Sequence, residues 1–258
     1  MYSDIFGKEV PLLKNLTQEQ LAALFVIRCS SIKEFMAKGR AKSELWGDTA
    51  KGLIMQMANE ICYATNIQTN ATKTIAKGVV LENDSIELVN RVYFENYTKN
   101  DLRLSNGIIT GCPDIIDHGK RMIIDIKSSY SLDSFAKERF GKGTDYTAQL
   151  RGYLWLYNMD YGCTAHTLLN TPKELWKYGD NASMHNYDHI PAEDRVIIGN
   201  IVYRDIAWEQ EVAERHALGL SMFLEYVEVF KNNGRELPQP PIEQVVDDLE
   251  EIEDTQAA

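Results

Sequence analysis

Apolar and polar residues alternate along the chain with two different periods, which predicts a mixture of helices and strands. Apolar residues three or four positions apart are typical of amphipathic helices, and short runs rich in isoleucine and valine are typical of strands. The expected helices cover residues 17–36, 44–64, 75–94, 144–159 and 208–232. The expected strands cover residues 102–104, 108–116, 122–128, 164–169 and 196–203, and residues 131–143 are expected to form a loop or a short helix.

Local motifs mark several of these boundaries. Thr17-Gln-Glu-Gln20 fits a capping box, in which the two side chains satisfy backbone N–H groups at the start of a helix. Gly234 follows the last helical pattern and is a natural C-terminal stop. Ser105-Asn106-Gly107 separates two short apolar runs and predicts the turn of a hairpin.

Residues 111–127 are predicted to contain a second hairpin. Two apolar runs flank a polar stretch with His118-Gly119 at its centre, and glycine accepts the positive φ that tight turns require. A two-residue turn at His118-Gly119 places Asp114 opposite Ile123. This register predicts which side chains of the two strands are neighbours.

Two carboxylates and a lysine are expected on the same face of this hairpin. Side chains alternate between faces with period two, so Asp114, Asp125 and Lys127 point to one side. The predicted register makes the two aspartates diagonal neighbours, roughly 7–8 Å apart at the backbone. A solvated face with surface ion pairs is the simplest interpretation, but Cys112 and Ile123 share this face. Carboxylates beside apolar groups are unfavourable unless they are paired or bound to a metal.

Polar residues on two predicted helices are further candidates. Glu82 lies in the middle of the apolar face of the helix expected over residues 75–94. A carboxyl group there either protonates, pairs with a lysine or arginine, or ligates a metal. Gln149 and Tyr153 are four residues apart and therefore share a helix face, although Tyr153 also suits the hydrophobic core.

Composition excludes several classes of protein. The 258 residues, 44% of them hydrophobic, suit one domain with a core of its own. No apolar run approaches the ~18 residues that span a bilayer, and the N-terminus shows no secretory signal, so we expect a cytoplasmic protein. The four cysteines are widely separated and the five histidines do not cluster, which disfavours zinc and iron–sulfur sites.

The negative net charge of −11 is partly local. Seven acidic residues and no basic ones lie between Glu243 and the C-terminus, which leaves −4 for the rest of the chain. Such a body can still carry a basic groove. The basic segment Lys38–Ser43 is either a solvated connection between helices or a phosphate-binding loop.

Four motifs occur in one order along the chain: Gly78-x-x-x-Glu82, Pro113-Asp114, Asp125-Ile126-Lys127 and Gln149-x-x-x-Tyr153. This order resembles the PD-(D/E)xK nuclease superfamily, and most closely its phage-lambda-type exonucleases and their RecB-like relatives. The resemblance implies an α/β (α+β) fold with a restriction-endonuclease-like core, in which helices flank a central mixed β-sheet.

The resemblance also implies a domain organisation. The nuclease core is expected at about residues 70–170 of a domain that covers residues 1–235. Residues 17–66 form a helical N-terminal segment, and residues 207–232 form a C-terminal helix. Residues 236–258 have no core pattern and are expected to be a disordered acidic tail.

The resemblance assigns catalytic roles to Glu82, Asp114, Asp125, Lys127, Gln149 and Tyr153. One or two Mg²⁺ ions, which Mn²⁺ can replace, are expected on Glu82, Asp114, Asp125 and the carbonyl of Ile126, because Mg²⁺ prefers oxygen ligands. Lys127 is expected to orient the nucleophile or to stabilise the transition state. Gln149 is expected to position water or the scissile phosphate, with Tyr153 supporting it.

The resulting expectation is a Mg²⁺-dependent exonuclease that degrades one strand of linear double-stranded DNA. The alternatives are a RecB-like or restriction-type endonuclease and, in another class, a non-catalytic protein that binds DNA ends. Phage-type relatives form rings, so we expect a homo-oligomer, most simply a trimer, that acts with a single-strand annealing protein. The expected phosphate contacts come from basic residues: Lys38, Arg40, Lys42, Lys137, Arg139, Lys142 and Arg151.

Overall fold

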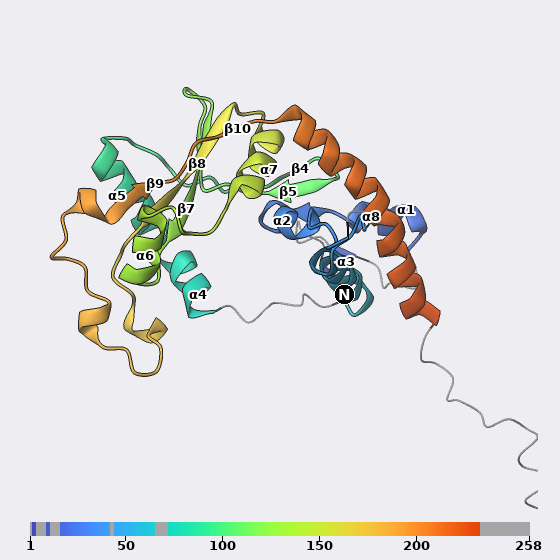
Figure 1. Cartoon of the computed structure of the whole chain (residues 1–258), viewed down its shortest axis with the longest axis horizontal. Helices are drawn as coiled ribbons and strands as arrows, with labels where there is room; N and C mark the ends of the chain where they lie inside the picture. The colour runs from blue at the N-terminus through green and yellow to red at the C-terminus, as the bar shows by residue number, and fades with distance from the viewer. Residues whose placement is uncertain (1, 4–8, 11–15, 42–43, 65–71, 233–258) are drawn as a thin grey trace, which may run out of the picture.

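The computed structural model describes residues 2–3, 9–10, 16–41, 44–64 and 72–232 (Figure 1). Lys42 and the acidic tail predicted at residues 236–258 lie outside these residues. The helices are α1 Gln18–Leu24, α2 Ile32–Phe35, α3 Asp48–Cys62, α4 Lys73–Val80, α5 Glu82–Tyr93, α6 Leu132–Arg139, α7 Thr147–Tyr157 and α8 Ile206–Asn232. The strands are β1 Tyr2–Ser3, β2 Glu9–Val10, β3 Ile27–Arg28, β4 Leu104–Ser105, β5 Ile109–Gly111, β6 Ile115–Asp117, β7 Met122–Ser128, β8 Tyr161–Thr167, β9 Val196–Ile198 and β10 Val202–Tyr203. No helix within the described ranges is long and apolar enough to cross a membrane.

A central mixed sheet positions the candidate site. Its strand order is β10-β8-β7-β6, and β9 also pairs with β8. β7 runs parallel to β8, whereas β6 is antiparallel to β7. The parallel pair requires a crossover, and α6 and α7 lie in that connection. This sheet, with its flanking helices, confirms the predicted fold class.

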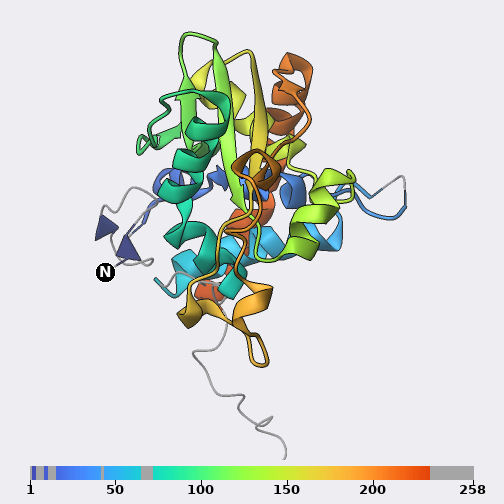
Figure 2. The same cartoon turned by 90° about the vertical axis from the view of Figure 1, so that its left-hand side faces the viewer.

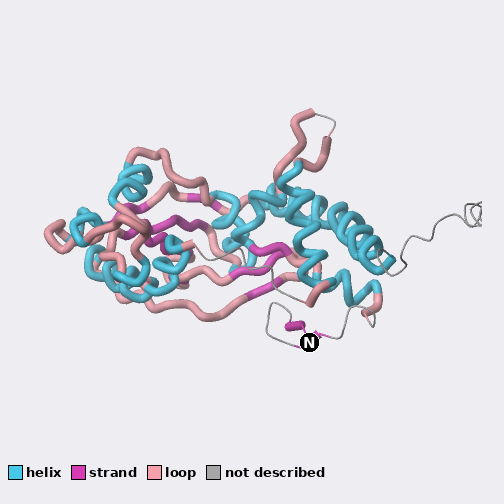
Figure 3. Tube along the Cα trace, turned by 90° about the horizontal axis from the view of Figure 1, so that it is seen from below, coloured by secondary structure: helices cyan, strands magenta, loops and turns pink. Residues whose placement is uncertain are grey.

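The two faces of β7 are covered by different helices. Ile124 and Ile126 pack in one core cluster with Ile86 of α5. Ile123, on the opposite face, belongs to a second cluster together with Leu154 of α7. Figure 2 shows α5 in front of the central strands, and Figure 3 shows the strands between helices. Asp125 and Lys127 have the parity of Ile123 and therefore lie on the α7 face of the sheet.

A smaller sheet and a group of helices extend the domain beyond α7. This sheet has the order β3-β5-β4, with β3 parallel to β5. The long helix α8 runs next to α3 (Figure 1). Phe25, which follows α1, stacks on Phe223 of α8 with ring centroids 4.9 Å apart. The N-terminal segment, α7 and α8 thus share one hydrophobic core.

The single helix predicted over residues 17–36 is wrong. The capping box at Thr17 is confirmed, but the helix ends at Leu24, and the C-cap residue Phe25 has a non-helical ψ of 79°. The chain then forms β3, in which Ile27 pairs with Ile109 of β5. Phe25 and Ile27 are both fully buried, and this tertiary pairing overrides the local helical pattern.

Other elements are divided where the sequence suggested continuity. The helix predicted over residues 75–94 is two helices, α4 and α5, which meet at Leu81 (φ −102°, ψ 14°). The strand predicted over residues 108–116 is divided into β5 and β6, which belong to different sheets. Pro113 lies between them, and it has no N–H for a strand ladder. The strand predicted over residues 196–203 is likewise β9 and β10, whereas β7 has the predicted bounds.

The hairpin of β6 and β7 has a longer turn than predicted. Asp117 pairs with Met122 and Ile115 pairs with Ile124, so the predicted register is wrong by two residues. The turn includes Arg121 at φ 53°, and Asp117 Oδ1 accepts a hydrogen bond from the Lys120 N–H at 2.9 Å. A shift of two preserves the face of every side chain. The observed register, continued by one residue, places Asp114 opposite Asp125 instead of diagonal to it.

Candidate active site

The six residues predicted to carry the chemistry line one open cavity of about 400 Å³. They are Glu82, Asp114, Asp125, Lys127, Gln149 and Tyr153. The other lining residues are Thr74, Ile75, Gly78 and Val79 of α4, together with Ile126, Ser128 and Tyr146. The structure therefore brings together side chains from α5, the residue before β6, β7 and α7, as the motif order suggested.

Asp114 is fixed by both its backbone and its side chain. Its carbonyl accepts a hydrogen bond from the N–H of Asn100 at 2.7 Å. Its side-chain Oδ2 accepts one from the N–H of Ile126 at 2.6 Å. Burial and, as the second cause, the neighbouring carboxyl group of Asp125 raise the pKa of Asp114 to about 8. Without a cation, this site therefore disfavours two ionised aspartates.

Asp125 and Lys127 form a close ion pair, with 2.6 Å between Oδ2 and Nζ. The side chain of Asp125 is only 3% exposed, and that of Lys127 is 24% exposed. Burial raises the pKa of Asp125, although Lys127 opposes this shift. Burial acts against the Lys127 ammonium, but its interactions with Asp125, Tyr146 and Asp114 together outweigh this effect, and the pKa of Lys127 is raised. Lys127 is thus held protonated.

The two aspartates suit a divalent cation. Asp125 Oδ2, although paired in charge with Lys127, makes no hydrogen bond of good geometry within the described residues. Mg²⁺ is commonly held by one or two carboxylates together with water and phosphate oxygens. The described residues contain no group of three or more His, Cys, Asp or Glu side chains arranged for a metal. The donor set here is therefore a pair of carboxylates.

Glu82 is displaced from the predicted position. It is the first residue of α5, not the middle of a continuous apolar helix face. Its carboxylate pairs with Lys99 at 3.3 Å, and its side chain is 21% exposed. This is the ion pair that the sequence left open as an alternative to metal ligation. Glu82 nevertheless lines the same cavity as Asp114 and Asp125.

Lys127 has two further contacts that hold its ammonium group. Its Nζ donates a hydrogen bond to Gln149 Oε1 at 3.5 Å. The same Nζ lies 4.5 Å from the ring centroid of Tyr146, the residue before α7. Tyr146 was not among the candidate residues from the sequence. The sequence contains one signal for its contact with Lys127, because Tyr146 lies three residues before Gln149 at the start of the same helix.

Tyr153 supports Gln149 from within the core. Its hydroxyl accepts a hydrogen bond from Gln149 Nε2 at 2.8 Å. Burial raises the pKa of Tyr153 above its usual range, so the hydroxyl stays neutral. A Cβ at Gly111 would lie 2.6 Å from the Tyr153 ring, so glycine is required for this close approach. Tyr153 thus combines core packing with orientation of Gln149.

Lys77 is a buried cation that sequence reasoning did not interpret. Its Nζ donates hydrogen bonds to the carbonyls of Leu169 at 2.6 Å, Ser129 at 2.7 Å and Tyr130 at 3.3 Å. Burial lowers the pKa of Lys77 to about 8. These bonds tie α4, which forms one wall of the cavity, to the segments that follow β7 and β8.

The described basic residues proposed for DNA contact lie outside the active-site cavity. Lys38 pairs with Glu211 at 3.1 Å, Lys137 with Asp133 at 2.7 Å, and Arg151 with Asp205 at 3.0 Å. Arg139 donates a hydrogen bond to the Asp194 carbonyl at 3.1 Å. Arg40 and Lys142 are exposed. Any phosphate track made by these residues would therefore lie outside the lining of the cavity.

Taken together, the mixed sheet, its flanking helices and the Asp114, Asp125 and Lys127 cluster define a restriction-endonuclease-like fold with a PD-(D/E)xK arrangement. Comparison with solved structures agrees with this class. The chain is similar to a phage-related exonuclease from Haemophilus somnus 129PT, with a TM-score of 0.70 and 25% sequence identity over 79% of this chain and 95% of that one.

A second similar structure is an alkaline exonuclease from Laribacter hongkongensis, with a TM-score of 0.58 and 16% identity over 83% of this chain and 96% of that one. Its complex with dAMP gives a TM-score of 0.57. No protein-family model and no curated protein sequence matches the chain. The resemblance to the phage-lambda-type exonuclease branch of the PD-(D/E)xK nucleases is confirmed by these structural neighbours.

Proposed function

We propose that this chain is a Mg²⁺-dependent exonuclease that hydrolyses one strand of linear double-stranded DNA during phage recombination or related DNA processing. The observation that carries this proposal is the convergence of Asp114, Asp125 and Lys127 in one cavity. That cavity lies in a fold shared with exonucleases. The alkaline exonuclease from Laribacter hongkongensis binds dAMP, a deoxynucleotide, which supports DNA as the substrate class.

The residues of this chain suit the cation that such hydrolysis requires. Asp114 and Asp125 would hold one or two Mg²⁺ ions, with the carbonyl of Ile126 and with Glu82 if it exchanges its partner Lys99. When bound, Mg²⁺ supplies Lewis-acid activation of water and neutralises charge that develops on phosphate oxygens. The raised pKa of Asp114 favours this arrangement, because a cation relieves the repulsion between the two carboxylates.

Lys127 would stabilise the transition state. Its ammonium group is fixed by Asp125, Gln149 and the Tyr146 ring, and a preorganised charge stabilises a developing anion without reorganising during the reaction. Gln149, held by Tyr153, would orient the attacking water or the scissile phosphate. Because Lys127 is held protonated, we assign it an electrostatic role in this state rather than that of a general base.

DNA ends, a homotrimer and an annealing protein complete the proposal. The exposed residues Arg40 and Lys142 are the described candidates with the least competition from acidic partners. Lys38, Lys137 and Arg151 would have to exchange carboxylate partners for phosphates. Several such contacts make binding strongly dependent on salt concentration. These residues would guide the duplex and hold its terminal 5′-phosphate.

The direct test is incubation of the purified chain with a linear duplex labelled at each 5′ end. With millimolar Mg²⁺ we expect progressive loss of one strand, and with EDTA we expect none. The Asp125→Asn variant is the matched inactive control. Stable binding to DNA ends without any cleavage, in Mg²⁺ or in Mn²⁺, would refute the enzyme and favour a non-catalytic end-binding protein.

A further inference from the structure

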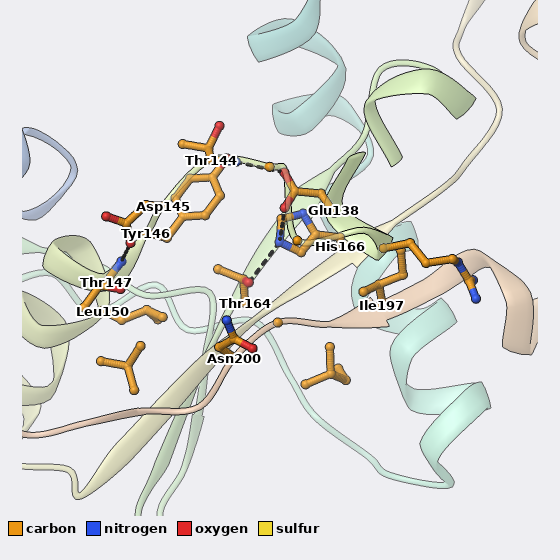
Figure 4. Close-up of a pocket in the computed structure, with 16 residues that line it drawn as sticks. Glu138, Thr144, Asp145, Tyr146, Thr147, Leu150, Thr164, His166, Ile197 and Asn200 are labelled. Atoms are coloured by element: carbon orange, nitrogen blue, oxygen red, sulfur yellow. Dashed lines mark hydrogen bonds and ion pairs between the residues drawn. The ribbon is translucent and has the colours of Figure 1, made fainter. Parts of the chain in front are cut away.

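A second cavity, of about 390 Å³ and drawn in Figure 4, shares a lining residue with the active-site cavity. Tyr146 lines both of them. The second cavity lies between the end of α6, the start of α7, β8 and the segment that joins β9 to β10. Its lining includes Glu138, Asp145, Tyr146, Thr164, His166 and Asn200. None of them was a candidate from the sequence.

The two cavities open on the same face of the central sheet. In the parallel pairing of β7 with β8, Asp125 is the partner of Thr164, and Lys127 is the partner of His166. Paired residues of neighbouring strands point to the same side. Thr164 and His166 therefore continue the row of Asp125 and Lys127, one strand further from β6.

Tyr146 spans the boundary between the cavities. Its ring centroid lies 4.5 Å from Lys127 Nζ on one side. On the other side, it lies 5.9 Å from the centroid of the His166 ring. The Tyr146 ring therefore connects the active-site Lys127 to His166 by direct contact with each of them. When the phosphate of a nucleotide lies at the active-site carboxylates, the base of the same nucleotide can therefore reach the second cavity.

The floor of the second cavity is polar but uncharged at neutral pH. His166 is 4% exposed, and its Nε2 lies 2.9 Å from Thr164 Oγ1. Burial lowers the pKa of His166 to about 4, so the ring is neutral. The contacts of the ring with Thr164 Oγ1 and with Glu138 Oε2 are both made through Nε2. Figure 4 shows the His166 and Thr164 side chains together on this floor.

The walls disfavour a phosphate group. The N-terminus of a helix attracts anions, but at α7 the carboxylate of Asp145 already occupies this position. Its Oδ1 accepts a hydrogen bond from the Thr147 N–H at 3.0 Å. Hydrogen bonds from Thr147 hold the pKa of Asp145 below its usual value. Glu138 adds a second carboxylate, 3.6 Å from His166 Nε2. Arg139, the basic residue of this lining, is already bonded to the Asp194 carbonyl.

We propose that this second cavity is a nucleobase subsite, which holds a base of the strand being cut next to the scissile phosphate. The site offers an aromatic wall at Tyr146 and neutral hydrogen-bonding groups at Thr164, His166 and Asn200, which suit a planar, uncharged, polar ligand. The assignment rests on the proposed nuclease function, and it adds a ligand and a place for that ligand.

Direct binding tests this subsite without any cleavage. Ligand-observed NMR in EDTA would compare deoxyadenosine, which has a base and no phosphate, with deoxyribose 5-phosphate, which has a phosphate and no base. We expect deoxyadenosine to bind at millimolar concentration and deoxyribose 5-phosphate not to bind. The reverse preference, or no binding of deoxyadenosine to the wild type, would overturn the proposal.

Two exposed neighbours provide matched variants. Asn200→Trp places a large side chain in the second cavity and should weaken deoxyadenosine binding at least tenfold. Ile201→Trp adds similar bulk at the next position, which is 55% exposed and outside the cavity lining, and should leave binding unchanged. Equal weakening by both variants would place the nucleoside elsewhere and overturn the assignment.

A cleavage assay on linear duplex, run with the same preparations, separates this inference from the proposed function. Wild-type cleavage without deoxyadenosine binding would remove only the base subsite. Deoxyadenosine binding that is sensitive to Asn200→Trp, without any cleavage, would support a base-binding cavity and remove the nuclease function.

Discussion

Asp114 Oδ2 accepts a hydrogen bond from the backbone N–H of Ile126 at 2.6 Å. The bond crosses from the residue before β6 to the middle of β7, directly beside Asp125. It fixes the Asp114 carboxylate on the side of the sheet where Asp125 and Lys127 lie. Two acidic groups are thereby held close together in a buried place, and this arrangement leads to predictions about metal binding, catalysis and pH.

Mg²⁺ or Mn²⁺ at millimolar concentration should raise the melting temperature of the protein. A cation that binds only the folded state stabilises it by mass action, and it also relieves the repulsion between Asp114 and Asp125. Asp125→Asn should reduce this increase, as measured by differential scanning fluorimetry. Asp133→Asn, which changes a carboxylate whose side chain is 76% exposed, is the control and should keep it. An absent shift in wild type and variants alike would contradict the metal site.

Lys127→Ala should reduce the cleavage rate by about 100-fold or more while the metal-dependent thermal shift persists. Loss of one preorganised group that stabilises the transition state typically has an effect of this size, and a protonated lysine is not a metal ligand. Asp114→Ala should lose both cleavage and the thermal shift. Lys173→Ala, at an exposed lysine, is the control. Near-normal cleavage by Lys127→Ala would show that Asp125-Ile126-Lys127 is not the catalytic segment.

Asp114 should make the metal-free protein less stable as pH rises. Its pKa is about 8 in the folded state and 3.8 in the unfolded state, so the unfolded state loses its proton first. Stability then falls between about pH 4 and pH 8, by up to about 1.4 kcal/mol per pH unit. Asp114→Asn removes this proton linkage and can still accept the Ile126 N–H.

Urea unfolding in EDTA from pH 5.5 to 8 measures this effect. The advantage of Asp114→Asn over wild type should grow with pH. Taking the difference between the two proteins cancels the contributions of His166 and Lys77, which both proteins share. A stability difference that does not depend on pH would mean that Asp114 is already ionised in the folded protein.

The Tyr146 ring should matter through its contact with Lys127. Tyr146→Phe keeps an aromatic ring and should retain most of kcat. Tyr146→Leu loses a cation–π contact worth about 0.5–2 kcal/mol, which corresponds to about a 2- to 30-fold loss in kcat. Because the ring stabilises the ammonium, the alkaline limb of the kcat–pH profile should move to lower pH for Tyr146→Leu only. Identical profiles for both variants would assign Tyr146 a packing role.

Periodicity was sufficient to predict the strand that carries the site. β7 has the bounds expected from its run of isoleucines, and the alternation of faces placed Asp114, Asp125 and Lys127 on one side. This conclusion survived a register error of two residues, because an even shift leaves the parity unchanged. The error arose because Gly119 suggested a two-residue turn, whereas Arg121 adopts the left-handed conformation and lengthens the turn.

Contacts between distant segments could not be read from local patterns. Ile27 leaves its helical pattern because it pairs with Ile109, more than eighty residues away. The partner of Glu82, Lys99, follows α5 in a segment without regular structure. Tyr146 and His166 come together because α7 packs against β8. Such relationships depend on tertiary packing and strand order, whereas the family resemblance implied only a central mixed sheet flanked by helices.

The most direct measurement of the central claim uses one reaction that contains a linear duplex and a covalently closed circular duplex of different length, with Mg²⁺ present. An exonuclease needs an end, so the linear DNA should shorten progressively to mononucleotides and single strand while the circle stays intact. Nicking or linearisation of the circle at a rate comparable to loss of the linear DNA would contradict this account and favour an endonuclease.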